Sequence, residues 1–390
     1  MTECCLMVNV RQSAVNFGCH LPGRRKIATI PRMAARESAE LERLESVLGA
    51  RPRARFAQLP TPIHRLANFG ARIGIPELWI KRDDLTGLEG GGNKTRKLEF
   101  IVGDALQAGA DMLATIGAIQ SNHTRQTAAA AARSGLKCAL LHFGWTEDAG
   151  PGYRDVGNLL LSSLMGAQLY VDDTPRPIED QGPLDEFCAY LSGLGHRPYA
   201  IPGGASEHRL GSLGYMACAA EIERQCLEMR TDFDYIVHCT GSSSTQSGLL
   251  AGYAALGKRM QIIGIADDDE TVIKRGRVLA LANSSLAECG LEAAVSAADV
   301  NVFAVDQSSY GKADEQTFAM IRMLAATEGL GADPVYEGKA LRGLQALAAD
   351  GFFPPGSRVL LMHLGGTPAI HAYASQFGAP RLIPYRGPER

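Results

Sequence analysis

The chain has 390 residues, of which 46% are hydrophobic and 21% are charged. This composition is typical of a soluble globular protein of about two domains, and it excludes a disordered, collagen-like or coiled-coil chain. The 39 basic and 42 acidic residues give a net charge of -3 with no basic stripe, so we expect no nucleic-acid partner. The longest purely apolar runs, such as residues 128–132, are far shorter than the ~18 residues of a membrane helix, so we expect no membrane span.

The nine cysteines are scattered along the chain, and none forms a C-x-x-C pair. The pattern therefore offers neither a zinc site nor a thioredoxin-like redox site. Most of these cysteines lie in apolar stretches, which is typical of buried, inert thiols. Because this usage fits a reducing compartment, we predict a cytoplasmic protein.

Residues 1–52 are predicted to be an N-terminal extension that is poorly structured and carries no chemistry. The first 36 residues contain six basic residues and one acid, Glu3, and they lack the apolar core of a secretory signal. Two interpretations of residues 1–32 stay open. One is an organellar presequence, and the other, which we favour, is an upstream extension before an ordinary start at Met33.

From residue 77 onward, strand-like and helix-like segments alternate. A strand over 77–81 precedes a glycine-rich turn and a helix over 93–109, and a buried strand over 111–117 precedes a helix over 122–135. Further apolar runs of strand length follow at 137–143, 167–171, 197–202, 234–239, 261–266, 301–305 and 358–364. This order predicts an α/β fold with parallel strands and helices on both faces. Ligands of such folds bind in the turns after the carboxyl ends of the strands.

The first candidate turn, TGLEGGGNKTRKLE at 86–99, contains Lys94. It is not a nucleotide-binding P-loop, because Asn93 separates Gly92 from Lys94 and the G-K-[ST] core is absent. The partial positive charge of a helix N-terminus lowers the pKa of an amine, which suits a lysine that forms a Schiff base. Judged on this motif by itself, a solvated surface lysine is an equally good interpretation.

The second candidate turn, CTGSSSTQSGLLAG at 239–252, carries four consecutive hydroxyl residues. They are Ser242, Ser243, Ser244 and Thr245. Small hydroxyl residues between a strand and a helix can present hydroxyls and backbone N–H groups to a phosphate. The alternative is a capped helix with a polar loop, but the run of four favours the phosphate. No G-x-G-x-x-G is present, so a dinucleotide fold is not supported.

The third candidate turn, GAIQSNHTRQ at 117–126, places Ser121, Asn122 and His123 at a helix start. Helical spacing offers no second histidine or carboxylate there, so we expect no metal. A lysine, a phosphate cradle, the tyrosines of two further polar turns and no metal-ligand set together imply an organic phosphate cofactor that is held covalently. Pyridoxal 5'-phosphate, which binds through a lysine, is the candidate.

Five motifs occur in the order found in one family of pyridoxal-phosphate enzymes: GGNKTRKLEF, QSNHTRQTAAAAARSG, TGSSSTQSG, DPVYEGK and HLGGTPA. Through them, residues 55–377 resemble the family of 1-aminocyclopropane-1-carboxylate (ACC) deaminases and D-cysteine desulfhydrases. The resemblance implies the tryptophan synthase β-like fold, known as fold type II, with two three-layer α/β/α domains and the cofactor in the cleft between them. It implies a large cofactor-binding domain over 53–106 and 206–390 and a small domain over 107–205. It also implies a homo-oligomer, dimeric or higher, that acts on a small amino acid.

The resemblance also assigns roles to individual residues. Those implied to be catalytic are Lys94 (which forms the Schiff base), Ser121, Tyr310 and Tyr336. Those implied to bind the cofactor, besides Lys94, are Asn93, Asn122, Ser242, Ser243, Ser244, Thr245 and Glu337, of which Glu337 is the partner of the pyridine nitrogen. Those implied to bind substrate are Ser121, Asn122, His123, Trp145 and Leu364.

The residues that distinguish the substrates of this family resemble two different groups of its members. Glu337, Leu364, Trp145 and the SEH at 206–208 resemble ACC deaminases. His123 and the short TGLEGG turn instead resemble D-cysteine desulfhydrases and L-cysteate sulfo-lyases. The balance favours a deaminase that converts ACC to 2-oxobutanoate and ammonia. β-Elimination from D-cysteine or L-cysteate, and cofactor binding without turnover, stay open as alternatives.

Overall fold

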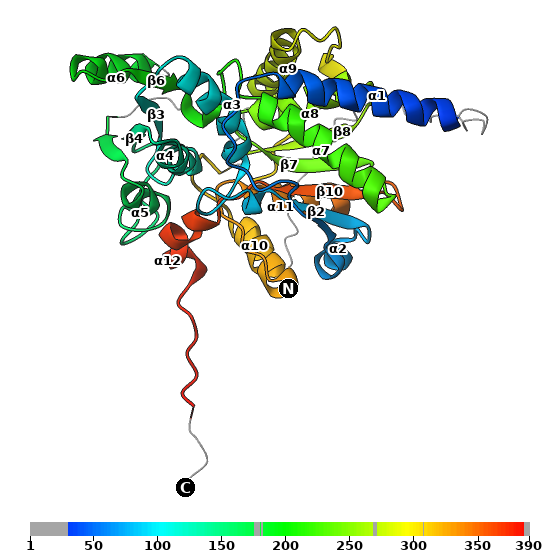
Figure 1. The fold of residues 1–390 in the computed structure, drawn as a ribbon. Helices are drawn as coiled ribbons and strands as arrows, with labels where there is room; N and C mark the ends of the chain where they lie inside the picture. Colours follow the sequence, from blue (N-terminus) through cyan, green and yellow to red (C-terminus); the bar gives the residue numbers. More distant parts are fainter. Residues whose placement is uncertain (1–29, 175–179, 181, 268–270, 307, 386–390) are drawn as a thin grey trace, which may run out of the picture.

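The computed structural model describes residues 30–174, 180, 182–267, 271–306 and 308–385. Two separate sheets organise this part of the chain, and helices cover both faces of each sheet (Figure 1). Within these ranges, every helix is too short or too polar to span a membrane.

The smaller sheet has four parallel strands in the order β5-β4-β3-β6. The strands are β3 (Met112–Ala118), β4 (Lys137–Phe143), β5 (Gln168–Asp172) and β6 (Pro198–Ile201). Helices α4 (Asn122–Ser134) and α5 (Gly157–Leu164) lie on one face, and Phe187 and Leu191 of α6 (Gly182–Gly193) pack on the other. All four strands come from residues 112–201, which lie inside the segment predicted as the small domain. The boundaries at 107 and 205 stay predictions.

The larger sheet has six strands in the order β1-β2-β10-β7-β8-β9. The strands are β1 (Ile63–Arg65), β2 (Leu78–Arg82), β7 (Tyr235–Thr240), β8 (Gln261–Ala266), β9 (Asn301–Phe303) and β10 (Val359–His363). Only the edge strand β1 is antiparallel to its neighbour; the other described strands of this sheet pair in parallel. Parallel pairing requires a crossover connection between strands, and the helices supply it.

Two hydrophobic cores hold the helices of the larger sheet in place. One core packs α3 (Asn93–Gln107), α7 (Leu213–Met229), α8 (Ser244–Ala255) and α9 (Thr271–Glu288) against one face. The other packs α2 (Ala67–Ile73), α10 (Glu315–Glu328) and α11 (Glu337–Ala349) against the opposite face. The first core also includes Leu113 and Leu140 of the smaller sheet, so it joins the two halves of the described chain.

Every strand predicted from residue 77 onward is present, with ends that differ by at most two residues. The prediction missed β1, which has only three residues, Ile63–Arg65. A segment this short cannot show the alternation of apolar and polar residues by which a half-buried strand is recognised.

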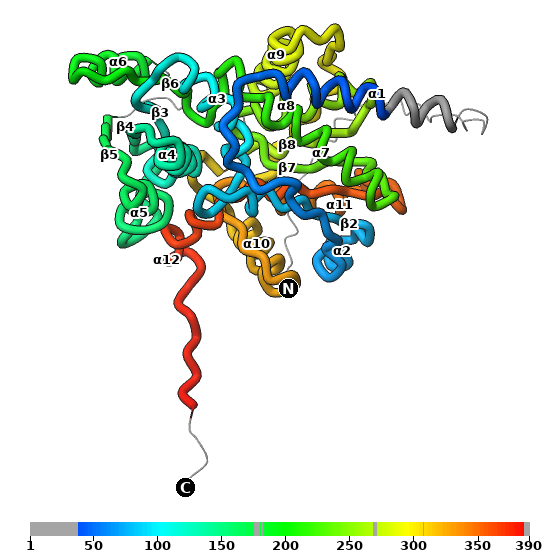
Figure 2. The backbone as a smooth tube through the Cα atoms, in the orientation of Figure 1, coloured from blue at the N-terminus to red at the C-terminus, as the bar shows by residue number. Residues whose placement is uncertain are grey.

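The expectation that residues 1–52 are poorly structured is wrong for residues 30–49, which form helix α1 (Ile30–Gly49). Leu41, Leu44 and Leu48 share one face of this helix and are 2%, 1% and 3% exposed. The helix lies along α7 and α8 (Figure 2). Leucines at these spacings form an apolar stripe, which stabilises the helix because it is buried. Residues 1–29 lie outside the described residues.

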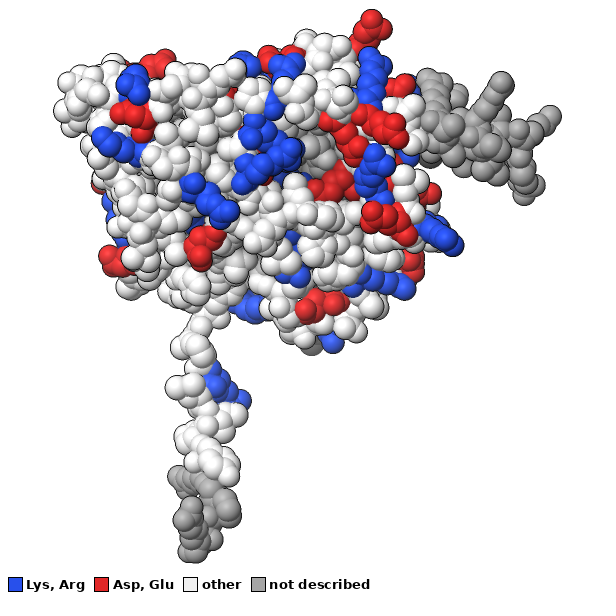
Figure 3. Space-filling view, in the orientation of Figure 1, with Lys and Arg blue, Asp and Glu red and all other residues white. Residues whose placement is uncertain are grey.

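Charges of both signs are interspersed on the face of the molecule shown in Figure 3. Exposed ion pairs occur elsewhere in the described chain as well, between Arg224 and Glu45 at 2.6 Å and between Arg322 and Glu315 at 2.7 Å. Exposed pairs of this kind contribute little to stability, about 0–1 kcal/mol each.

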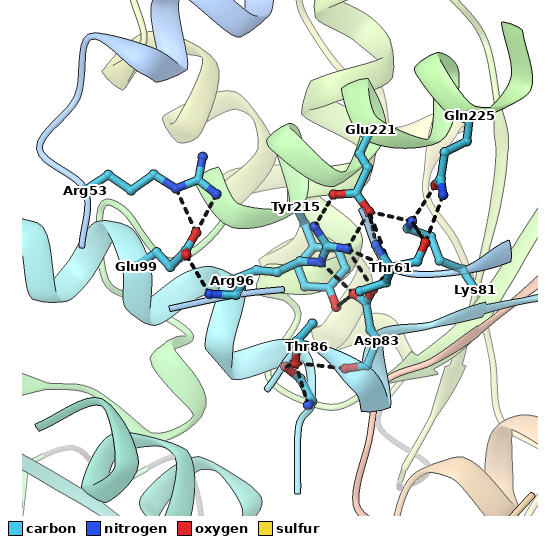
Figure 4. A network of polar contacts seen from close by, with 12 residues as sticks. Arg53, Thr61, Lys81, Asp83, Thr86, Arg96, Glu99, Tyr215, Glu221 and Gln225 are labelled. Carbon is cyan, nitrogen blue, oxygen red and sulfur yellow. Dashed lines mark hydrogen bonds and ion pairs between the residues drawn. The ribbon is translucent and has the colours of Figure 1, made fainter. Parts of the chain in front are cut away.

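A buried ionic cluster connects α3 to β2 and α7 (Figure 4). Arg96 is 1% exposed and donates two hydrogen bonds of 2.8 Å to Asp83 and two, of 2.8 and 2.9 Å, to Glu221. Glu221 also accepts from Lys81 at 2.6 Å, and Asp83 accepts from Tyr215 at 2.7 Å. Burial raises the pKa of Glu221, but the charges of Arg96 and Lys81 outweigh it and lower that pKa to about 2. Arg96 likewise lowers the pKa of Asp83 despite its burial, so both carboxyl groups are ionised at neutral pH.

We expect the substitution Arg96→Met to lower the free energy of unfolding by about 3–5 kcal/mol, because it removes the cation bonded to the buried Asp83 carboxylate and leaves Glu221 with Lys81 alone. The measurement is the urea midpoint of the variant against the unmodified protein. The control is Arg43→Met, since the Arg43 side chain is 58% exposed and its nearest carboxylate, Glu40, lies at 3.7 Å. The control should change stability by less than about 1 kcal/mol. Equal losses of unfolding free energy in the two variants would show that the buried cluster stabilises the protein no more than an exposed ion pair does.

Candidate active site

The carboxyl ends of strands from both sheets face one cavity. Its walls come from the ends of β3, β7, β8 and β10 and from the turns and helix starts that follow strands. Thirteen of the fourteen predicted site residues line it: Asn93, Lys94, Ser121, Asn122, His123, Trp145, Ser242, Ser243, Thr245, Tyr310, Tyr336, Glu337 and Leu364. Ser244 does not, because its side chain is fully buried beneath the loop.

Lys94 is positioned by a turn that requires glycine. Gly91 has φ +55°, and a Cβ there would lie 1.8 Å from the backbone oxygen of Asp84. The buried guanidinium of Arg125 holds the turn by donating to backbone carbonyls of Leu88, Glu89 and Gly91. The turn leads directly into α3, so Lys94 lies at the N-terminal end of that helix and lines the cavity.

The environment of Lys94 favours a reactive amine. Its Nζ lies 3.3 Å from Asn93 Oδ1, and no carboxylate pairs with it among the described residues. Burial lowers the pKa of Lys94 to about 8, even though the charge of Asp267 acts in the opposite direction. A substantial share of this amine is therefore neutral, and so nucleophilic, at physiological pH.

Lys97 lies one helical turn further along α3 but does not line the cavity. It is fully buried, and its Nζ donates a 2.7 Å hydrogen bond to Ser244 Oγ. Burial and the neighbouring charge of Lys94 lower the pKa of Lys97 well below its usual value. Of the two lysines, Lys94 is therefore the one that a molecule in the cavity can reach, and Lys97 lies behind the hydroxyl loop.

The start of α4 presents polar groups to the cavity from the side of the smaller sheet. Ser121 caps the helix, and its Oγ accepts hydrogen bonds from the backbone N–H groups of His123 at 3.2 Å and Thr124 at 3.3 Å. Asn122 Oδ1 accepts a 2.8 Å hydrogen bond from Asn158, so the Asn122 side chain has a fixed orientation. Its NH₂ group then remains as a donor.

The hydroxyl loop joins β7 to α8. Ser243 adopts a left-handed conformation with φ +65°, directly before the helix begins. Its Oγ is buried and has no hydrogen-bond partner among the described residues. Thr245 Oγ1 accepts a 3.1 Å hydrogen bond from Asn93, which connects this loop to the turn that carries Lys94. A left-handed residue at a helix N-terminus forms a concavity of backbone N–H groups that suits an anion.

Two tyrosine hydroxyls meet on another wall of the cavity. The hydroxyl oxygens of Tyr310 and Tyr336 are 2.8 Å apart. Burial raises the pKa of each phenol, so both are protonated at neutral pH. The ring of Trp145 packs edge-to-face against Tyr310, with centroids 6.4 Å apart. The hydrogen bond brings the tyrosines of two distant turns together.

Glu337 is a buried carboxyl group without a close cation. It is 3% exposed, and its Oε1 accepts a 3.1 Å hydrogen bond from the backbone N–H of Leu364. The nearest basic group is the Nδ1 of His363, at 3.9 Å. Burial and the charge of Asp333 raise the pKa of Glu337 well above its usual value. A cationic or N–H group next to this carboxyl would stabilise its ionised form.

Five charged residues of the cavity wall were not among the predicted site residues: Glu207, Asp267, Lys274, Arg277 and Asp333. Glu207 and Asp333 belong to the SEH and DPVYEGK motifs, but no role was predicted for either. Asp267 is the first residue after strand β8, so the rule that ligands bind at the carboxyl ends of strands was enough to find it. Lys274, which pairs with Asp267 at 2.9 Å, lies inside helix α9 with Arg277, where no motif marks either residue.

These groups fit pyridoxal phosphate. Lys94 supplies an amine. The unpartnered hydroxyl of Ser243, with the Lys97 amino group behind the loop, suits a phosphate, whose charge would favour the protonated form of that lysine. Glu337 suits a protonated ring nitrogen. In the described part of the chain, no group of three or more His, Cys, Asp or Glu side chains could hold a metal ion.

Comparisons with known sequences agree with this fit. The sequence profile of a family described as "Pyridoxal-phosphate dependent enzyme" matches residues 54–365. Two proteins described as 1-aminocyclopropane-1-carboxylate deaminase, from Methylobacterium nodulans and Mesorhizobium japonicum, are each 42% identical to this chain. The alignments cover 82% and 81% of this chain and 95% of each relative.

Solved structures show the same fold. A crystal structure described as an ACC deaminase homologue is 34% identical, has a TM-score of 0.77, and covers 86% of this chain and 98% of its own. A structure of O-ureido-L-serine synthase, 16% identical with a TM-score of 0.56, covers 85% of this chain and 93% of its own, and supports the fold alone. The predictions of fold type II and of the cofactor are confirmed. The chain belongs to the family of pyridoxal-phosphate dependent enzymes.

Proposed function

We propose that this enzyme opens the ring of ACC and releases 2-oxobutanoate and ammonia. The observation that carries the proposal is the hydroxyl pair of Tyr310 and Tyr336, 2.8 Å apart in the same cavity as Lys94. ACC has no α-hydrogen, so ring opening needs a nucleophile that attacks the ring or a base that removes a β-hydrogen. Relatives at 42% identity that carry the name ACC deaminase support this choice of substrate.

The tyrosine pair can serve either route. Tyr336 is the proposed nucleophile, and the adjacent Tyr310 hydroxyl can relay the Tyr336 proton by passing on its own proton as it receives that one. Lys94 is the other proposed proton carrier, since its pKa of about 8 allows it to accept and release protons near neutral pH. Bound pyridoxal phosphate withdraws electrons from the amino acid that is joined to it, which lowers the barrier to breaking bonds at Cα.

The start of α4 is proposed to bind the substrate carboxylate. Ser121 Oγ already accepts two backbone hydrogen bonds, so its own hydrogen is free to be donated to a carboxylate oxygen. The Asn122 NH₂ group and the partial positive charge of the helix N-terminus attract the same anion. This orients the amino acid with its ring toward the tyrosines.

The hydroxyl loop and Lys97 are proposed to hold the phosphate. Ser242, Ser243 and Thr245 line the cavity, and the Lys97 ammonium reaches Ser244 from beneath. A dianion at the loop would supply the opposite charge that this buried lysine lacks, and it would raise the lysine pKa toward its usual value. Ser244 then acts through Lys97 rather than by facing the cavity, in contrast to its predicted role.

β-Elimination from D-cysteine or L-cysteate is the second candidate function. His123 favours it, because the imidazole lines the cavity and offers a hydrogen-bonding group next to Lys94. In that reaction a base removes the α-hydrogen, the sulfur group leaves, and hydrolysis yields pyruvate and ammonia. The homo-oligomer and the cytoplasmic location also stay predictions; light scattering of the purified enzyme tests the first of these.

A panel of ACC, D-cysteine, L-cysteine, L-cysteate and D-serine tests the proposed function. We expect ammonia and 2-oxobutanoate from ACC at the highest kcat/KM of the set. The measurement is a joint assay of ammonia and 2-oxo acid, with sulfide and sulfite as additional products. Release of sulfide from D-cysteine or of sulfite from L-cysteate, without turnover of ACC, would contradict the deaminase proposal and favour β-elimination as the function.

Lys94→Met should abolish covalent attachment of the cofactor, because it removes the amine that lines the cavity. Borohydride reduction of the unmodified holoenzyme, followed by peptide mapping, should place the cofactor on Lys94. The matched control is Lys97→Met, which should keep the attachment at Lys94 but lower cofactor affinity about tenfold through loss of a charge-assisted contact. Finding the reduced cofactor on Lys97 would show that Lys97, and not Lys94, is the lysine that binds the cofactor covalently.

Glu337→Gln should lower kcat/KM for ACC by about tenfold or more. The amide keeps the volume and the acceptor for the Leu364 N–H, but it removes the negative charge that stabilises a protonated ring nitrogen. Elimination from D-cysteine should fall less, because a good leaving group assists it. Steady-state kinetics on both substrates provide the measurement. Equal losses for the two substrates would argue against this role.

A further inference from the structure

Lys339 is a buried lysine of the DPVYEGK motif that does not line the cavity. It is the third residue of helix α11 and is 0% exposed. Its Nζ donates a 2.6 Å hydrogen bond to the backbone carbonyl of Asp267 and a 2.9 Å hydrogen bond to the backbone carbonyl of Ser308. Burying an amino group is costly unless it is hydrogen-bonded, so these two contacts hold the side chain in place.

The three residues joined at this point belong to three segments around the cavity. Asp267 directly follows strand β8, so it is attached to the larger sheet. Ser308 precedes Tyr310 by two residues, and Lys339 follows Tyr336 by three residues, which is about one helical turn. The Lys339 amino group therefore connects the segments that carry the two tyrosines, and it connects both of them to the end of a strand.

Each tyrosine segment is held in shape by an aspartate of its own. Asp306 accepts from the backbone N–H of Ser308 at 2.8 Å and from that of Asp314 at 3.0 Å, which closes the loop over 306–314. Asp333 accepts from the backbone N–H of Tyr336 at 2.9 Å, directly before helix α11 begins. These hydrogen bonds fix the shape of each segment, but they do not fix the position of one segment relative to the other.

In the described part of the chain, two hydrogen bonds join the segment 308–314 to the segment 333–339. One is the 2.8 Å contact between the hydroxyls of Tyr310 and Tyr336, and the other is the contact from Lys339 to Ser308. A tyrosine hydroxyl that faces a cavity can exchange its partner for water or for a ligand. The contact of Lys339 is buried, so it persists whatever the cavity contains.

We propose that Lys339 is a positioning residue that holds the Tyr310 loop against the start of α11, so that the two tyrosine hydroxyls stay within hydrogen-bond distance. This rests on the proposed function, because that function gives the tyrosine pair its role in ring opening. Lys339 acts through the backbone of Ser308 and not on the substrate. Its effect on rate comes from placement, since a displacement of about 1 Å in a reacting group can lower a rate about 100-fold.

The placement can be measured without any substrate. In holoenzyme labelled with carbon-13 at the ζ-carbon of tyrosine, the signal that is lost in Tyr310→Phe belongs to Tyr310. We expect Tyr336→Phe to move this signal, because it removes the hydroxyl 2.8 Å away. In a Lys339→Met background, which keeps a straight side chain without N–H groups, Tyr336→Phe should leave the Tyr310 signal in place. A movement as large as in the unmodified background would overturn the positioning role.

The matched control is Lys312→Met. Lys312 is a lysine of the same loop, its side chain is 52% exposed, and it pairs with Glu147 at 3.3 Å. This variant should keep the full response of the Tyr310 signal. If Lys339→Met fails to bind the cofactor, Lys339→Gln takes its place in the test. Its side chain is one atom shorter and cannot reach both carbonyls, so the response should be reduced, and a full response would overturn the role.

Steady-state kinetics with ACC supply a second readout. Lys339→Met should lower kcat about tenfold or more and leave KM within about twofold, because the misplaced hydroxyls act in the chemical step. In a Tyr310→Phe background the same substitution should cause no further loss, since a residue that acts through Tyr310 is not additive with it. Losses that multiply would refute the proposal. Absence of ACC turnover in the unmodified enzyme would contradict the proposed function and leave the carbon-13 result intact, so the two failures are distinguishable.

Discussion

The position of Lys94 depends on the buried guanidinium of Arg96. Lys94 and Arg96 are two residues apart at the start of α3, and Arg96 is bound to Asp83 after β2 and to Glu221 on α7. Asp83 also accepts through its backbone oxygen from Gly92 N, at 2.9 Å, so the same residue holds both ends of the glycine turn. Four charged hydrogen bonds in a buried site leave little freedom to the helix start, so they fix where the Lys94 amine enters the cavity.

A buried basic group and a buried acidic group lie at separate places around the cavity. Lys97 lies beneath the hydroxyl loop at the start of α8, and Glu337 lies at the start of α11 beside Leu364. In the protein alone, burial disfavours the ionised form of both groups, which lowers the pKa of the lysine and raises that of the glutamate. A ligand with an anionic group at one end and a protonatable nitrogen at the other compensates both. Pyridoxal phosphate has this arrangement, and we propose that these two groups would fix the direction in which it binds.

Much of this arrangement could be predicted from the sequence, because the relevant signals are local. Apolar runs and glycine stops predicted the strands, and the turns after them contained Lys94 and Ser121. Glu337 lies instead at the start of α11, after the loop that follows helix α10, and was found through its motif. Spacing could not show that the Ser244 hydroxyl faces inward to Lys97, since that depends on the rotation of α8 against α3. The buried leucine face of α1 was present in the sequence, but the unusual composition of the residues before it hid the signal. Contacts between distant segments, such as Arg96 with Glu221, leave no local pattern at all.

His123 shows how the side chain at one position can change the chemistry of a site without changing the fold that holds it. Its backbone N–H donates to Ser121 Oγ, as any residue at this position of a capped helix could do. The side chain is what can differ: here its imidazole reaches Thr115 on β3, and His123 lines the cavity. We propose that the helix cap secures the carboxylate site, while the side chain at position 123 is free to vary with the substrate. Specificity within this cavity can therefore shift through one side chain whose backbone stays fixed by the cap.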